Sequence, residues 1–165
     1  MIRRACFVWL LLLLAFAGCY SFKGISIPTE ANTFTIQPFQ NTSASVPTLG
    51  QTMTESLKTR ILGETRLRYA SDAGDIEFSG TISEFRVSAV APQADATTQF
   101  SRLDITVSVS CDNPYDPENP EWTSRFSRFA EFESTVNFLD VRDDLIEEIN
   151  EQLIEDIFNR AFTNW

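Results

Sequence analysis

The residue with the most informative chemistry is Cys19, because the segment before it has the composition of a cleavable leader. Residues 3–4 are both arginine, residues 7–16 are continuously apolar, and residues 17–18 are the small side chains that a signal peptidase requires. This order predicts that residues 1–18 are a lipoprotein signal peptide. Cys19 is then the lipidated first residue of the mature protein.

The residues around Cys19 resemble a bacterial lipobox, with Phe16 standing where leucine is usual. The apolar run is short of the roughly 20 residues that a transmembrane helix needs. An ordinary secretory signal is the first alternative and a membrane span a more distant one. Several acyl chains, such as palmitate, would attach the protein permanently to a membrane. Tyr20 in place of aspartate favours the outer membrane.

The composition of the mature chain restricts its partners. Cleavage before Cys19 leaves 147 residues, which is enough for one domain with a substantial core. Because two arginines leave with the signal, the formal charge changes from −10 to −12. Such a chain is expected to repel nucleic acid, and it could bind an anionic lipid only through a local basic patch.

The cysteines predict no intramolecular disulfide. Cys6 is removed with the signal and Cys19 is consumed by the lipid, so Cys111 has no partner within the chain. At the end of an alternating strand, Cys111 is expected to be a small buried hydrophobe. An intermolecular bridge is the alternative.

The sequence lacks the residues for common catalytic sites. It contains no histidine, which excludes Ser-His-Asp and Cys-His catalysis and the usual zinc sites. Acidic and amide side chains in residues 112–120 could suggest calcium, but their spacing is not that of an EF-hand and three prolines predict a turn. We expect no enzymatic activity, no cofactor and no metal. Carboxylates on the last helix are expected to form a solvated face.

Two helices are expected. A capping box at Thr48 and Gln51 should start the first, and Gly63 should end it as a left-handed cap. Its apolar stripe recurs every four residues at Leu49, Met53, Leu57 and Ile61. The second helix follows from helical spacing of apolar residues over 145–162, with carboxylates on the opposite face. Acids dominate its early turns and Arg160 lies in its last, as the helix dipole prefers.

The strands are predicted by period-two patterns in residues 33–37, 76–89, 103–111 and 122–132, with a short strand possible at 66–69. The apolar phase slips by one residue near Ser83 and Glu84, which predicts a β-bulge that keeps both halves of that strand directed at the core. The expected fold is α+β, with two helices packed on one face of a mostly antiparallel four- to five-stranded sheet. Residues 33–165 would form this single domain, and residues 19–32 its lipidated tether.

Three arginines are the best local basic groups in this acidic chain. Arg125 and Arg128 lie on the strand of residues 122–132, and Arg86 lies on the bulged strand. They are candidate contacts for an anionic ligand or a partner. Structural pairing with the acidic helices is the alternative interpretation.

Both ends of the mature chain are similar to one known family. The segment YSFKGISIP follows Cys19 at residues 20–28, residues 47–49 resemble the start of the family's first helix, and EEINEQLIEDIFNRAFTNW at residues 147–165 is similar to its closing helix. The chain resembles LptE, the lipopolysaccharide-assembly lipoprotein family. The resemblance implies a sandwich fold of the LptE type.

It also implies a non-enzymatic outer-membrane lipoprotein that plugs a β-barrel translocon, an LptD-like protein, helps it to assemble, and supports lipopolysaccharide transport to the outer leaflet. The domain would lie in the periplasm or in the barrel lumen. Lipopolysaccharide itself is a possible second ligand, with Arg125, Arg128 and Arg86 as the residues to contact it. Two alternatives are an adaptor or pilotin for another outer-membrane machine and a carrier of an apolar ligand.

Overall fold

The computed structural model describes residues 27, 29–42, 46–91 and 99–163. The predicted signal peptide and Cys19 lie outside these residues. Within them, no helix is both long enough and apolar enough to cross a membrane. In chain order the elements are β1 (Thr33–Ile36), β2 (Gln40–Asn41), α2 (Leu49–Glu64), β3 (Arg68–Tyr69), β4 (Ile76–Ala89), β5 (Phe100–Asp112), β6 (Glu121–Glu133) and α3 (Phe138–Phe162).

The sheet is mixed and has six strands in the order β3-β1-β4-β5-β6, with β2 paired to β4 beside β1. The α+β class and the two helices were predicted correctly. The prediction of four to five mostly antiparallel strands was wrong, because β1 and β2 both run parallel to β4, and β1 also runs parallel to β3. The chain passes from β1 to β3 through α2, and such a crossover returns a strand in the same direction.

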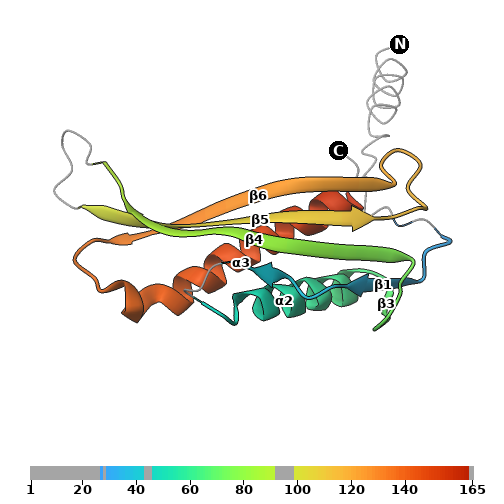
Figure 1. Cartoon of the computed structure of the whole chain (residues 1–165), viewed down its shortest axis with the longest axis horizontal. Coiled ribbons are helices and arrows are strands. Elements are labelled where there is room, and N and C mark those ends of the chain that lie inside the picture. Colours follow the sequence, from blue (N-terminus) through green and yellow to red (C-terminus); the bar gives the residue numbers. More distant parts are fainter. Residues whose placement is uncertain (1–26, 28, 43–45, 92–98, 164–165) are drawn as a thin grey trace, which may run out of the picture.

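Both helices cover one face of the sheet and run in the same direction along it (Figure 1). The apolar stripe of α2 is fully buried, and on β5 the alternate side chains from Leu103 to Cys111 point into the same core. Helix α3 closes the core with apolar residues of its buried face, among them Ile149, Leu153 and Ile157. Among the described residues, no helix covers the other face of the sheet, which presents mainly the polar half of each alternating strand.

The predicted bulge is present, with a register shift between Ile82 and Glu84 where β4 pairs with β5. The bulge was expected to keep both halves of β4 directed at the core, and this expectation holds only in part. Ile82 is fully buried before the bulge, and Phe85 packs against the edge of the core after it. Val87 is 42% exposed, because this end of the β4–β5 hairpin extends past the helices (Figure 1).

The predicted ends of α2 require correction. Helix α2 does begin after Thr48, but the Thr48 side chain makes no capping hydrogen bond, because its backbone is already helical at φ −80° and ψ −10°. The helix also continues through Gly63 to Glu64. Thr65 ends it in an extended conformation and donates from Oγ1 to the Ile61 carbonyl over 2.7 Å. A hydroxyl therefore performs the role that was predicted for a left-handed glycine.

Candidate functional site

The three predicted basic residues do not form one cluster. Arg86 and Arg125 lie on the open face of the sheet and flank one carboxylate, with their nitrogens 3.3 and 3.5 Å from the two oxygens of Glu84. Arg128 lies on the helix side, where Nε and Nη2 each donate over 2.6 Å to Asp156 of α3. This hydrogen-bonded pair raises the pKa of Arg128. Pairing with an acidic helix therefore holds for Arg128, whereas Arg86 pairs with Glu84 of its own strand β4, and Arg125 of β6 reaches the same carboxylate across β5.

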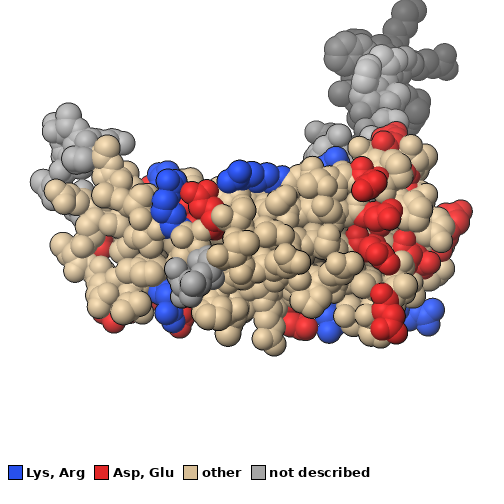
Figure 2. All heavy atoms as spheres, in the orientation of Figure 1, with Lys and Arg blue, Asp and Glu red and all other residues tan. Residues whose placement is uncertain are grey.

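The far end of the open face is acidic. Glu77 is the cross-strand neighbour of Asp112, which is in turn the neighbour of Glu121. Figure 2 shows acidic side chains gathered at this end of the molecule, where the β5–β6 loop lies. Glu77 and Arg86 are separated by roughly 30 Å along β4 at the usual rise of a strand. The open face is therefore polarised along its length.

Residues 112–120 form the predicted turn. Asn113 donates its backbone amide to the Pro120 carbonyl over 2.7 Å, and Asp116 Oδ1 accepts from the amides of Glu118 and Asn119. The Asp116 carboxylate thus serves the backbone of its own loop. In the described residues, no group of three or more potential metal ligands converges here or elsewhere.

Cys111 is the small buried residue that its pattern predicted. Its side chain is 2% exposed at the end of β5, and it forms no disulfide. Burial, with a smaller contribution from Asp112 and Asp116, raises the pKa of the Cys111 thiol to about 12. The thiol is therefore protonated at neutral pH and serves as packing rather than as a nucleophile.

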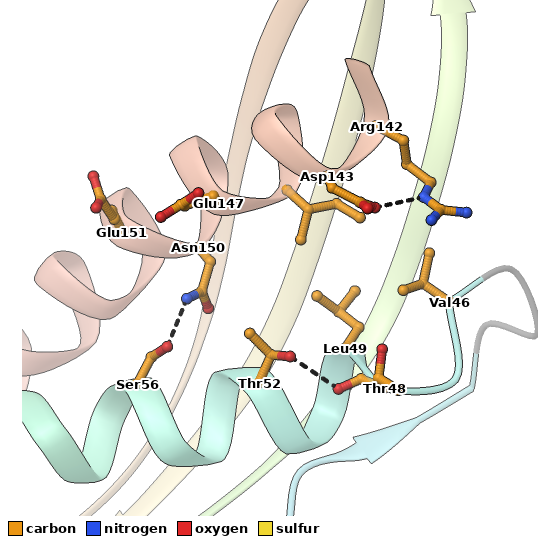
Figure 3. A pocket seen from close by; sticks show the side chains of 11 residues that line it. Val46, Thr48, Leu49, Thr52, Ser56, Arg142, Asp143, Glu147, Asn150 and Glu151 are labelled. Atoms are coloured by element: carbon orange, nitrogen blue, oxygen red, sulfur yellow. Dashed lines mark hydrogen bonds and ion pairs between the residues drawn. The ribbon is translucent and has the colours of Figure 1, made fainter. Parts of the chain in front are cut away.

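The principal concave feature is a groove between the two helices, which the sequence analysis did not identify. Two adjoining pockets of about 500 and 670 Å³ share Thr52, Ser56, Asn150 and Glu151 and extend along both helices. Figure 3 shows the side chains of α2 and α3 converging on the first of them. Because Thr48 and Arg142 lie at one end and Arg60 and Glu155 toward the other, the parallel course of the helices defines one continuous groove.

Asn150 lies midway along the groove and is almost entirely buried, with 6% of its surface exposed. Its Nδ2 donates to the Ser56 hydroxyl of α2 over 2.8 Å (Figure 3). Its Oδ1 has no hydrogen-bond partner among the described residues. Buried amide oxygens are ordinarily paired, so an unpartnered one that lines a groove indicates a position for a donor.

One wall of the groove is a ridge of carboxylates on α3. Four acids recur at every fourth residue and line the two pockets: Asp143, Glu147, Glu151 and Glu155. Like charges four residues apart on a helix cost about 0.2–0.5 kcal/mol per pair. Asp143 accepts a hydrogen bond from Arg142 over 2.8 Å, whereas Glu147 and Glu151 form no ion pair within the described part of the chain. The ridge therefore holds unneutralised negative charge.

The opposite wall is a ridge of hydroxyls on α2 formed by Thr48, Thr52 and Ser56, followed by Arg60. Arg60 lies 3.0 Å from Glu64 Oε1 and stacks over the Phe158 ring, with 5.4 Å between the guanidinium carbon and the ring centroid. The two arginines of the groove thus already have acidic neighbours. Arg60 Nε is a buried donor that lies beside Glu64 without forming a well-aligned hydrogen bond. The carboxylates that line the two pockets outnumber the arginines, so the groove as a whole carries net negative charge.

Two features of the sequence relate to this groove, but neither of them predicts a site by itself. Asn150 interrupts the apolar stripe of α3 between Ile149 and Leu153, and the four acids follow a strict four-residue spacing. The same spacing is typical of a solvated helix face, which is how it was interpreted. Only the packing of α2 beside α3 gives these residues a common surface.

The arrangement defines a class of α+β sandwich proteins with one mixed sheet, two helices on one face and no catalytic constellation among the described residues. The sequence model of the LptE family, described as lipopolysaccharide-assembly, matches residues 31–161. The chain therefore belongs to the LptE family, and lipopolysaccharide assembly is the process in which it acts. No curated protein matches the sequence.

Solved structures share the fold at low sequence identity. Protein XCC0632 from Xanthomonas campestris is 7% identical with a TM-score of 0.55, covering 82% of this chain and 86% of that one. Hypothetical protein CT253 from Chlamydia trachomatis is 10% identical with a TM-score of 0.51, covering 79% and 95%. The rare lipoprotein B from Shewanella oneidensis is 9% identical with a TM-score of 0.46, covering 77% and 92%. The first two establish a common fold.

Proposed function

We propose that this chain is a non-enzymatic outer-membrane lipoprotein that plugs the β-barrel of the lipopolysaccharide translocon and assists its assembly. In this role it supports transport of lipopolysaccharide to the outer leaflet. The observation that carries the proposal is the family match over residues 31–161, which includes the whole described sheet, α2, and all of α3 but its last residue. The proposed organisation is a signal peptide at 1–18, a lipidated tether at 19–32 and one domain at 33–165.

The packed interior supports a plug rather than a carrier of an apolar ligand. A carrier needs an internal apolar cavity of the ligand's size. Here the space between sheet and helices is occupied by large, fully buried side chains, among them Phe34, Phe78 and Phe158. The two large pockets lie instead between the helices, where exposed polar residues line them.

Any direct contact with lipopolysaccharide is proposed for one end of the open face. The side chains of Arg86 and Arg125 are 64% and 66% exposed, and among the described residues each has an ion pair only with Glu84, so guanidinium donors remain available to an anion although Asp104 is the cross-strand neighbour of Arg86. Guanidinium groups of this kind form strong hydrogen bonds with phosphates. Arg128 is the weakest candidate of the three, because Asp156 already takes two of its donors.

Native purification tests the proposed function. The tagged full-length protein would be isolated from outer membranes in mild detergent, with an unrelated domain carried by residues 1–32 as the matched control. We expect a lipopolysaccharide-assembly barrel to co-purify in a fixed ratio with the full-length protein only. Absence of that barrel from the purified material would contradict the proposal. Recovery of another outer-membrane machine, with normal lipopolysaccharide export on depletion, would favour the adaptor alternative.

A further inference from the structure

The groove between α2 and α3 has the dimensions of a peptide site. It follows α2 from Thr48 to Arg60, a length of about 18 Å at the usual helical rise. An extended chain advances about 3.3 Å per residue, so roughly five or six residues would fill this length. The floor also contains apolar groups, Leu49, Ile146 and Ile154, that can receive aliphatic parts of a ligand.

The polar groups of the groove favour a ligand that donates hydrogen bonds. Asn150 Oδ1 is a buried acceptor without a donor among the described residues. Glu147 and Glu151 line the same pocket and have no ion-pair partner there, whereas Arg142 is occupied by Asp143. The phosphates of lipopolysaccharide would be repelled by this wall. Because no three potential metal ligands converge in the described residues, a bound metal does not fit either.

We propose that the groove binds an extended, basic segment of a protein partner. A backbone or side-chain N–H of that segment donates to Asn150 Oδ1, and its lysine or arginine side chains pair with Glu147 and Glu151. The inference rests on the proposed function, since the partner would be a component of the lipopolysaccharide translocon. It deepens that function by assigning a surface and a chemistry to the contact.

Binding of defined peptides to the full chain in detergent tests the inference. The probe is a fluorescent hexapeptide of alternating lysine and serine, followed by anisotropy, with a glutamate–serine hexapeptide as its counterpart. We expect saturable binding of the basic peptide only, weakening as salt screens the charges. The Glu147→Gln/Glu151→Gln variant is expected to raise Kd at least fivefold, and Asn150→Leu should raise it about fivefold through the lost acceptor.

The matched control is Asp144→Asn/Glu148→Gln, which makes the same change in charge at the same spacing on α3. Neither Asp144 nor Glu148 lines the two pockets. This control is expected to leave Kd within twofold, and circular dichroism would verify that each variant is folded. Equal weakening by both pairs would mean nonspecific attraction to the helix and would overturn the inference. Equal binding of the acidic peptide, or no binding of the basic one, would overturn it too.

Site-specific photo-crosslinking in cells separates this inference from the proposed function. A photoreactive residue replaces Thr52 in the groove, and in a second strain it replaces Ser88 on the open face. We expect the groove position alone to crosslink to a lysine- or arginine-containing segment of the translocon, mapped by mass spectrometry. If the barrel co-purifies but the groove crosslinks to no basic segment, the inference fails and the proposed function stands. If the basic peptide binds but no barrel co-purifies, the proposed function fails.

Discussion

Asn150 of α3 and Ser56 of α2 are 94 residues apart in sequence and are joined by a hydrogen bond of 2.8 Å across the helix pair. The bond uses one end of the buried amide and leaves the other end facing the groove. A single side chain therefore links the packing of the helices to the surface that they form. Its contribution to stability can be measured separately from its contribution to binding.

Ser56→Ala is predicted to lower the free energy of unfolding by about 1–2 kcal/mol, because it leaves both ends of a buried amide unpaired. The matched control is Thr52→Ala, since the Thr52 hydroxyl bonds only the Thr48 carbonyl of its own helix, over 3.2 Å. That change should stay within about 0.5 kcal/mol. Urea denaturation followed by circular dichroism measures both values. Equal losses for the two variants would show that the Asn150 bond contributes nothing specific.

Two glycines of α2 are predicted to respond to alanine in opposite directions. A Cβ at Gly63 meets no atom within 4 Å and its backbone is helical, so Gly63→Ala should raise the free energy of unfolding by about 0.5–1 kcal/mol. A Cβ at Gly50 would lie 2.3 Å from the Phe39 carbonyl oxygen. Gly50→Ala should therefore lower stability by about 1–3 kcal/mol. Destabilisation by Gly63→Ala would instead indicate the left-handed cap that the sequence suggested.

The elements predicted correctly are those whose signal is local. Every second residue of β5 from Leu103 to Cys111 is buried, and α3 keeps its buried face over about five turns from Leu145 to Phe162, so each pattern is complete within one element. Even the bulge of β4 leaves a local trace, because one extra residue shifts the apolar phase. The turn at 112–120 likewise follows from its own prolines.

The features that were missed depend on neighbours distant in sequence. β2 has only two residues, too few for a period, and it was missed. β3 lies within the short strand predicted at 66–69, but its parallel pairing with β1, like that of β2 with β4, follows from the path of the chain through α2. The groove was missed for the same reason. Its acids have the spacing of an ordinary solvated helix face, and only the hydroxyls of α2 opposite them make a groove. No local sequence pattern shows that α2 packs beside α3.

Asp75 is predicted to make the domain more stable above acidic pH. Its Oδ2 accepts hydrogen bonds from the backbone amides of Asn32 and Thr33 and from the Thr33 hydroxyl, each over 2.9 Å. The bond from the Asn32 amide is the main reason that the pKa of Asp75 lies below its usual value of 3.8, and the Thr33 bonds add to it. This carboxylate fixes the point where the proposed tether enters the sheet.

Because the pKa of Asp75 is lower in the folded state, its contribution is complete above the unfolded pKa near 3.8 and disappears as the pH falls through the folded value. Asp75→Asn should therefore be less stable than the wild type at pH 7, and the difference should shrink below pH 3.8. Urea titrations at several pH values would measure it. A difference that stays constant down to pH 2.5 would assign the loss to altered packing instead of charge.

Loss of the lipid anchor is predicted to weaken function without unfolding the domain. In the part of the chain that the structure describes, the buried core begins at Ala31, with Ile27 packed against it, so we expect this core to form without the lipid at Cys19. The anchor acts by keeping the domain at a high local concentration beside a membrane-embedded partner. Cys19→Ala, expressed behind an ordinary cleavable secretory signal, should retain the wild-type urea midpoint. The amount of barrel recovered with the protein and the amount of lipopolysaccharide at the cell surface should both fall.

Raising the expression of the unanchored variant should restore part of the loss, because mass action can replace tethering. A shifted urea midpoint would show that the anchor is needed for folding, and unchanged export at normal expression would show that the domain finds its partner without a tether.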